Sequence, residues 1–288
     1  MGGAGMLGHK LLQVLGARFE TWATVRDLNE RLRKTNLFPD ATTVAGVDAT
    51  AFDSIVGAFA RVRPDVVINC IGIIKQRPQA KDPVLSLRVN SLLPHQLNQL
   101  CVCAGARLIH ISTDCVFSGQ KGRYDEAAMP DASDLYGRSK LMGEVTDHGA
   151  LTLRTSIIGR ELSAANGLLE WFLANRGRSV QGFSRAIFSG LPTIVLAHVV
   201  ADIIEKQPKL SGLFHVGSDP IDKYELLRLF DEAFDTKVEV RRNDDIVIDR
   251  SLDSSRFRNA TGFVPDPWPT LVTRMASDAT YYGQMERQ

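Results

Sequence analysis

The sequence predicts an α/β protein with a doubly wound parallel sheet and a smaller second lobe. Short apolar runs rich in β-branched residues alternate with longer amphipathic stretches, which is typical of strand–helix–strand units with right-handed connections. This alternation is clear up to about residue 160 and loosens after it. We therefore expect a first domain at residues 1–160. Residues 161–288 should form mainly the smaller α/β lobe, with some segments returning to the first sheet.

The individual elements follow from periodicity and length. In the first domain we expect a helix at 6–15, the end of a strand at 22–27, strands at 66–68, 108–111 and 151–153, and helices at 84–104 and 135–145. In the second lobe we expect helices at 167–175 and 223–234 and strands at 179–181 and 212–216. Residues 118–134 lack apolar periodicity, so they should form an exposed loop at the carboxyl end of a strand, where α/β sites lie.

Composition excludes several classes of function. Of the 288 residues, 44% are hydrophobic, which is enough for a sizeable core. Lys plus Arg number 34 and Asp plus Glu 33, so the net charge of +1 provides no general attraction to nucleic acid or anionic membrane. The four cysteines are not spaced like zinc ligands, and we expect no metal site.

The most apolar stretch, residues 191–204, is interrupted by His198 and Asp202, so we do not expect it to span a membrane. We also find no pattern of a cleaved leader. The expected location is therefore the cytoplasm. The sequence leaves the oligomeric state open, with a homodimer among the alternatives.

Gly2, Gly5 and Gly8 form a G-x-x-G-x-x-G loop that runs, through Met6 and Leu7, straight into an amphipathic stretch. Glycines let a backbone approach a pyrophosphate, and a helix N-terminus offers free N–H groups. The loop alone could equally be a flexible terminus. In the predicted strand–helix context it indicates that residues 1–160 are a dinucleotide-binding domain of the Rossmann type.

Such a loop normally follows a buried strand, whereas the printed sequence begins at Met1. We therefore expect a first strand upstream of Met1, in the middle of the sheet. Burying five or six apolar side chains there would contribute on the order of 10 kcal/mol. Restoring upstream residues should increase both stability and dinucleotide affinity.

Arg26 follows the expected second strand, where an acidic residue would bind the ribose of NAD. Because a guanidinium matches a 2′-phosphate, we expect NADP to be preferred, although Asp27 keeps NAD possible. Asp48, with Ala49 beside it, either bonds the adenine amino group or caps the helix that starts near Thr50.

Tyr136 and Lys140 lie four residues apart on one predicted helix, and Thr113 follows an apolar strand. A lysine one helical turn from a tyrosine should lower the pKa of the phenol, so that it can protonate a carbonyl oxygen. Thr113 can orient that oxygen by a hydrogen bond. Each residue taken singly has an ordinary structural explanation, but together with the glycine loop they indicate carbonyl reduction by a dinucleotide.

The chain resembles the extended short-chain dehydrogenase/reductase family, and within it the branch similar to dTDP-4-dehydrorhamnose reductase. The resemblance spans nearly the whole length. It rests on residues 2–11, 63–69, 112–117, 136–140 and 154–156.

This resemblance implies that Thr113, Tyr136 and Lys140 are the catalytic triad. It also implies that the cofactor is lined by Cys70, Ile71 and Gly72 after the fourth strand, and that the second lobe binds a nucleotide diphosphate sugar. Lys75 and Cys115 are substrate candidates because they should lie close to the sugar, and Asp114 is a third candidate beside them. Arg185 and Arg250 are the arginine candidates for binding the diphosphate. Cys115 replaces the tyrosine that is usual in this family.

The function implied is NADPH-dependent reduction of the 4-keto group of a nucleotide-activated 6-deoxy sugar, for a surface polysaccharide precursor. Two alternatives stay open. One is a sugar-nucleotide epimerase with tightly bound NAD. The other is a catalytically silent, dinucleotide-binding regulatory subunit.

Overall fold

The computed structural model describes residues 1–76, 78–162, 167–278, 280 and 282. Its centre is a parallel four-stranded sheet in the order β10-β5-β4-β3, formed by β10 (Gly212–His215), β5 (Leu151–Thr155), β4 (Arg107–Thr113) and β3 (Val66–Asn69). Apolar side chains of these strands are buried on both faces, as a parallel sheet requires. The predicted α/β class is confirmed.

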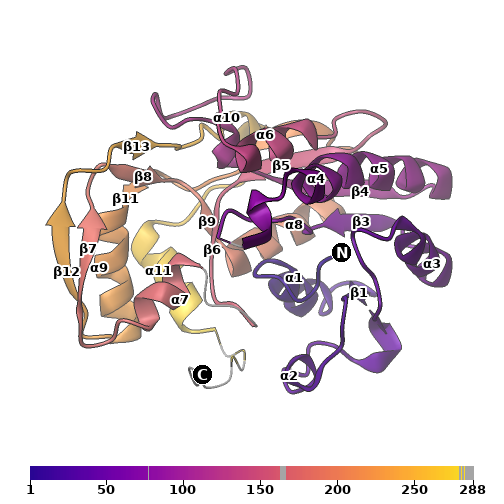
Figure 1. Ribbon diagram of the computed structural model, residues 1–288, viewed down its shortest axis with the longest axis horizontal. Helices are drawn as coiled ribbons and strands as arrows, with labels where there is room; N and C mark the ends of the chain where they lie inside the picture. The colour runs from indigo at the N-terminus through magenta and orange to yellow at the C-terminus, as the bar shows by residue number, and fades with distance from the viewer. Residues whose placement is uncertain (77, 163–166, 279, 281, 283–288) are drawn as a thin grey trace.

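Helices cover both faces of this sheet (Figure 1). One face packs against α1 (Gly8–Leu15) and α8 (Thr193–Lys206) in the largest apolar cluster of the molecule. The other face packs against α3 (Phe52–Val62) and α5 (Leu93–Ala104). The amphipathic stretches therefore turn their apolar sides inward from both directions, which makes the sheet doubly wound.

The helix expected at 84–104 is divided in three. It consists of α4 (Pro83–Ser86), a π-helical segment (Leu87–Leu92) and α5. Pro94 has no N–H and removes one α-helical hydrogen bond, and the wider π turn lies directly before it. Further along, α6 (Leu135–Met142) begins after Asp134, whose carboxylate accepts a hydrogen bond from the Gly137 N–H.

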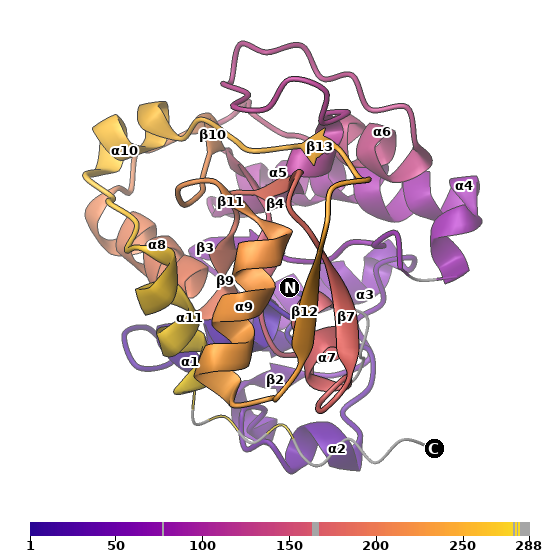
Figure 2. The same ribbon diagram turned by 90° about the vertical axis from the view of Figure 1, so that its left-hand side faces the viewer.

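The remaining short strands lie mostly around one helix of the second half of the chain. Parallel β7 (Ser179–Phe183) and β12 (Glu239–Asn243) lie beside α9 (Lys223–Phe234), as Figure 2 shows. The other strands are β8 (Ala186–Phe188) between β11 (Ile221–Asp222) and β13 (Ile248–Asp249), and the pair β6 (Ile157–Ile158) and β9 (Leu191–Pro192). The remaining helices are α7 (Leu168–Leu173), α10 (Ser255–Thr261) and α11 (Trp268–Ala276).

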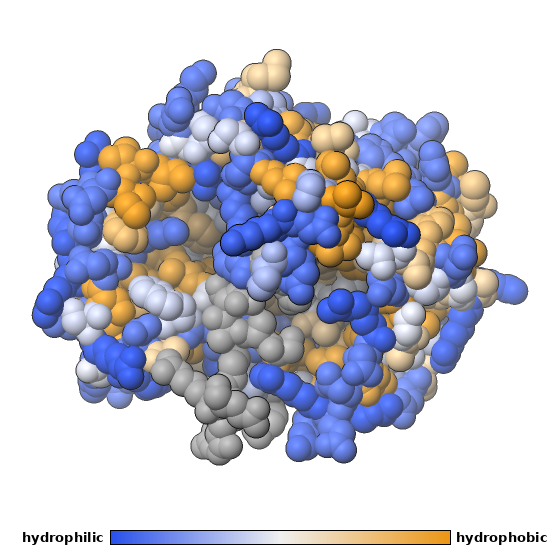
Figure 3. Space-filling model, viewed as in Figure 1, coloured by the Kyte–Doolittle hydropathy of each residue, from blue (hydrophilic) through white to orange (hydrophobic). Residues whose placement is uncertain are grey.

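Hydrophilic residues surround separate apolar patches on the face shown in Figure 3. Within the described ranges, none of the helices has both the length and the hydrophobicity needed to cross a bilayer.

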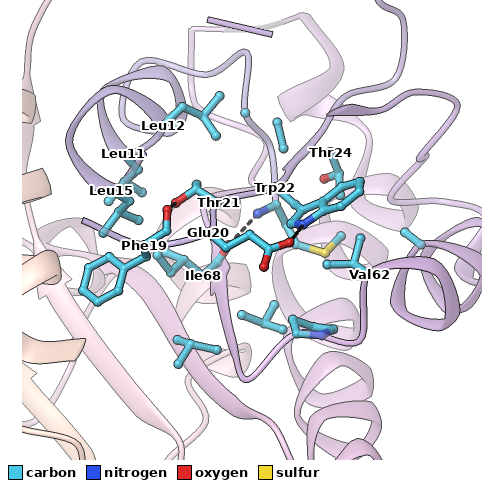
Figure 4. Close-up of a pocket in the computed structure, with 18 of the residues that line it drawn as sticks. Leu11, Leu12, Leu15, Phe19, Glu20, Thr21, Trp22, Thr24, Val62 and Ile68 are labelled. Atoms are coloured by element: carbon cyan, nitrogen blue, oxygen red, sulfur yellow. Dashed lines mark hydrogen bonds between the residues drawn. The ribbon is translucent and has the colours of Figure 1, made fainter. Parts of the chain in front are cut away.

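The sheet is interrupted next to the glycine loop. Parallel β1 (Ala23–Thr24) and β2 (Thr43–Val44) form a separate pair, and α2 (Glu30–Arg33) connects them. Between β1 and β3 lies a cavity of about 410 Å³. Figure 4 shows Leu11, Leu12 and Leu15 of α1 on one side of this cavity and Val62 of α3 on another.

The first residues of the chain bridge one end of this gap. The Met1 amine donates to the Ile68 carbonyl (2.7 Å), and the Met1 carbonyl accepts from the Cys70 N–H (3.2 Å), which is the pattern of a parallel ladder. On the other side, the Gly3 N–H donates to the Thr24 carbonyl (3.0 Å). Residues 1–3 therefore occupy the carboxyl end of a strand position between β3 and β1.

The hydrogen bonds of residues 1–3 also show how a strand between β3 and β1 would continue through the cavity. In β3 the peptide groups of Val66 and Ile68 point away from β4, because peptide groups alternate along a strand. Those of Trp22, just before β1, and of Thr24 in β1 likewise point away from β2. Both sets face the cavity. Burial lowers the pKa of the Met1 amine at the end of the gap, since a charged group there loses its hydration.

Joining about five valine and isoleucine residues to the Met1 amine is expected to fill this gap as a strand. The apolar side chains would be buried on both faces and an amide would replace the buried amine, so the melting temperature should rise by on the order of 10 °C. Differential scanning calorimetry measures the change. An extension of the same length made of serine and asparagine is the control, and equal melting temperatures for the two extended proteins would contradict the assignment.

Candidate active site

The carboxyl end of β4 and the start of α6 meet at the centre of the candidate site. Thr113 ends β4, and its hydroxyl accepts from the Cys115 N–H (3.1 Å) in the following 3-10 turn. Gly137 brings α6 directly onto this turn, because a Cβ at that position would lie 2.3 Å from the Cys115 carbonyl oxygen. This close approach places Tyr136, the preceding residue, beside Thr113.

The Tyr136 phenol lies near the Thr113 hydroxyl. Burial raises the pKa of the phenol above its ordinary value of 10, and Cys115 and Asp114 raise it further. The lowered pKa expected for Tyr136 is therefore not found, because burial outweighs any effect of nearby cations and the net pKa is raised. The phenol stays protonated at neutral pH, which is the form that can donate a proton.

Lys140 faces the strand behind the phenol. Its Nζ donates to the Ile111 carbonyl (2.8 Å) and lies 3.4 Å from Nε2 of His110. The side chain is buried, and burial lowers the pKa of the amine to about 8, although Glu144 and Cys70 oppose the change. Lys140 thus fixes α6 to β4 and holds a proton only loosely.

Two basic side chains lie near Tyr136 and Cys115. Lys75 pairs with Asp134 (2.8 Å), and its Nζ lies 5.6 Å from the centre of the Tyr136 ring. Arg250 donates from Nε to the Phe117 carbonyl (2.8 Å). Both cations are near Cys115.

Asp114 is buried in the same region, and burial raises the pKa of its carboxyl group while Arg250 opposes that rise. Lys223, the first residue of α9, is near Asp114 and Arg250. Arg185 is different. It is exposed in the turn between β7 and β8 and lies near Asp244, so the structure does not bring it to the other four substrate candidates.

The glycine loop lies at the carboxyl end of β3. Gly2 has φ = +75°, and a Cβ on it would lie 3.1 Å from the Ile71 side chain. A Cβ on Gly8 would lie 2.1 Å from the Gly2 carbonyl oxygen, so only glycine lets α1 start this close to the loop. Gly5 closes the turn by donating its N–H to the Gly2 carbonyl (3.0 Å). This tight cradle ahead of a helix N-terminus fits a pyrophosphate.

The other cofactor candidates lie around this loop. Cys70 and Gly72 flank Ile71, Leu7 is buried, and Met6 contacts Gly167.

Arg26 is exposed directly after β1 and lies near Asp48. The Asp48 carboxylate accepts hydrogen bonds from the Thr50 N–H and hydroxyl, both at 2.7 Å. It holds a local turn beside Ala49, and the N-cap of α3 is Ala51. The adenine alternative for Asp48 stays a prediction.

The sequence analysis did not select Lys223, Asn69 or His110 as site residues. Lys223 opens a helix, where a lysine is usually a solvated charge, and only the packing of α9 brings it to the cleft. Asn69 and His110 lie in neighbouring strands at directly paired positions. Polar residues in otherwise apolar strands were the available signal, since buried polar groups need partners.

One family model and several known proteins are similar to this chain. Residues 1–280 match the family model described as "RmlD substrate binding domain". The beta subunit of methionine adenosyltransferase 2 from Xenopus tropicalis is 26% identical over 244 residues, which are 77% of this chain and 66% of that protein. A dTDP-4-dehydrorhamnose reductase from Streptomyces griseus is 33% identical over 144 residues, 50% of this chain and 42% of that enzyme.

The chain thus spans less than two thirds of the length of these relatives. Among solved structures, a dTDP-4-dehydrorhamnose reductase from Bacillus anthracis str. Ames, in complex with NADP, superposes with a TM-score of 0.73 at 20% identity. The match covers 95% of this chain and 96% of that one. The Rossmann-like fold is confirmed.

A buried ion pair between Glu144 and Arg154 lies next to the end of β4. Glu144 accepts from Arg154 (2.7 and 2.8 Å) and from the Ser112 hydroxyl (2.6 Å), next to Thr113. Glu144→Gln is expected to lower the free energy of unfolding by about 3–5 kcal/mol, because it leaves the Arg154 charge buried without a counterion.

Urea denaturation measures this loss. Glu239→Gln, which removes the partner of Arg241 in an exposed pair, is the matched control and should change stability by less than about 0.5 kcal/mol. Similar small effects at both positions would show that the buried pair does not stabilise the site.

Proposed function

We propose a reaction for this chain from one premise: it belongs to the RmlD substrate binding domain family, whose model covers residues 1–280. The reaction is reduction of the 4-keto group of a nucleotide-activated 6-deoxy sugar by NADPH. The observation that supports it is the position of the Tyr136 phenol near the Thr113 hydroxyl, with Lys140 one turn further along the helix that carries Tyr136. Cytoplasmic synthesis of a surface polysaccharide precursor is the proposed setting.

Tyr136 is the proposed proton donor. Its raised pKa keeps the phenol protonated at neutral pH, and Thr113 supplies a second hydroxyl to orient the ketone oxygen. Bound NADPH would supply the hydride to the carbonyl carbon. As the C=O bond becomes C–O⁻, the O–H bond of Tyr136 breaks and its proton passes to that oxygen, which gives the alcohol and a phenolate.

Lys140 is proposed to stabilise this phenolate in its ammonium form. Because its pKa is about 8, the ammonium is the main form at neutral pH and is lost as the pH rises through that value. The rate of reduction should therefore fall on the alkaline side of about pH 8.

Lys75, Lys223 and Arg250 are proposed to bind the diphosphate of the substrate. All three cations lie near Cys115, and a diphosphate carries the opposite charge. The glycine loop and residues 70–72 are proposed to hold the cofactor, with Lys140 also contacting its ribose.

A second candidate function is a dinucleotide-binding subunit without catalytic activity. It is favoured by the similarity to a protein named as a subunit of methionine adenosyltransferase. The epimerase alternative uses the same residues with NAD retained between turnovers. Adding a 4-keto-6-deoxy sugar nucleotide with and without external NADPH separates these alternatives, since only a reductase consumes added NADPH.

Tyr136→Phe is expected to reduce the rate of NADPH oxidation with dTDP-4-keto-6-deoxy sugars about 100- to 10,000-fold, because it removes the proton donor and little volume. Absorbance at the reduced nicotinamide band measures the rate. Tyr224→Phe, in α9 near Arg228 and Arg242, is the matched control and should keep full activity.

A fully active Tyr136→Phe protein would eliminate the proposed mechanism. Wild-type protein that binds NADPH but oxidises it with none of these sugar nucleotides would favour the silent subunit.

Arg26→Ala is expected to raise the dissociation constant of NADPH by about tenfold and to leave that of NADH nearly unchanged, because only NADPH carries the 2′-phosphate. Fluorescence titration of each reduced dinucleotide measures both constants. Arg31→Ala, a change of another exposed arginine on the following helix α2, is the control. Equal losses for the two dinucleotides would remove Arg26 as the selector.

A further inference from the structure

Behind Lys140 lies a chain of three buried polar side chains from two strands and one helix. Asn69 ends β3, His110 lies at the paired position in β4, and Lys140 reaches them from α6. Asn69 and His110 have no exposed surface, and Lys140 is 5% exposed. The proposed reaction assigns no role to the first two.

The hydrogen bonds of Asn69 determine which way its amide faces. Its Oδ1 accepts from the Ile71 backbone N–H (3.1 Å), which can only donate. The amide nitrogen Nδ2 must therefore be the atom that lies 3.1 Å from Nδ1 of His110. An amide nitrogen can only donate, so Nδ1 of His110 has to accept and carries no proton.

The imidazole is neutral, because burial and the nearby Lys140 hold the pKa of His110 well below its usual value. A neutral imidazole without a proton on Nδ1 carries it on Nε2. That Nε2–H faces the Lys140 Nζ at 3.4 Å.

We propose that Asn69 and His110 are positioning residues that present an N–H donor to Lys140 and so favour its neutral amine. The neutral amine satisfies every contact: it donates to the Ile111 carbonyl and accepts from His110 Nε2. The ammonium form has no lone pair, so it cannot accept a hydrogen bond from the His110 Nε2–H, and two donors then face each other.

This inference deepens the proposed function and rests on it for its catalytic meaning. Lys140 would switch readily between ammonium and amine beside the Tyr136 phenol, since one form is favoured by the phenolate and the other by His110. Other titratable groups around this cluster are the Cys70 thiol after β3, His95 on α5, Tyr136 on α6, and Glu144 two residues after the end of α6. Glu144 and Cys70 raise the pKa of Lys140 and so favour its ammonium form. His95 lowers the pKa of His110 and so favours the neutral imidazole. The Nε2–H of that imidazole therefore acts on Lys140 in the opposite direction to Glu144 and Cys70.

Nitrogen-15 NMR of the full chain labelled in histidine tests the tautomer directly, because protonated and unprotonated ring nitrogens have well-separated shifts. His110→Gln assigns the signals. We expect wild-type His110 to be protonated on Nε2. A proton on Nδ1 would overturn the inference whether or not the protein reduces any sugar.

The coupling is tested in the same spectra between pH 6 and 10. The Nε2 signal of His110 should shift with a midpoint near pH 8, where Lys140 titrates, and this shift should be absent in Lys140→Met. A signal that stays constant in the wild type, or that shifts equally in Lys140→Met, would overturn the coupling. Loss of ketone reduction in Tyr136→Phe is a separate result that tests only the proposed function.

Discussion

The candidate site depends on the hydrogen bond from the buried Lys140 amine to the Ile111 carbonyl. This bond attaches α6 to β4 at 2.8 Å and fixes the helix in rotation, so that Tyr136, one turn earlier, faces the end of the strand. Gly137 permits the approach, because any side chain there would collide with the turn after Thr113. A small set of contacts between one helix and one strand thus places a phenol, a hydroxyl and an amine together. Tyr136, Lys140 and Thr113 are thus positioned by α6 and β4 without any contribution from the substrate candidates of the second half of the chain.

Burial has opposite effects on the two titratable members of this centre. It raises the pKa of the phenol and lowers that of the amine, since both charged forms lose hydration. The two groups therefore differ more in proton affinity than their ordinary pKa values do, so the phenol keeps its proton at a pH where the amine can lose one. The Asn69 and His110 pair adds a donor that acts on the amine alone.

Much of this arrangement could be predicted from the sequence because it depends on local rules. The spacing of Tyr136 and Lys140 places them on one helical face, and the apolar runs locate the strand ends. What could not be predicted depends on partners far apart in the chain. Lys10 lies in an amphipathic helix yet is buried, because Asp278 and Thr280 near the other end of the chain bind it. Lys223 and the pKa of Tyr136 likewise depend on packing that no single segment specifies.

The proposed function depends above all on protonation of a ketone by the Tyr136 phenol beside a nicotinamide. A crystal structure with NADP⁺ and a thymidine diphosphate 6-deoxy sugar tests it most directly. We expect the sugar C4 oxygen to lie within hydrogen-bonding distance of both Tyr136 and Thr113, with the nicotinamide ring against the same carbon. A nicotinamide ring bound away from Tyr136, or a sugar whose C4 oxygen contacts neither hydroxyl, would contradict it.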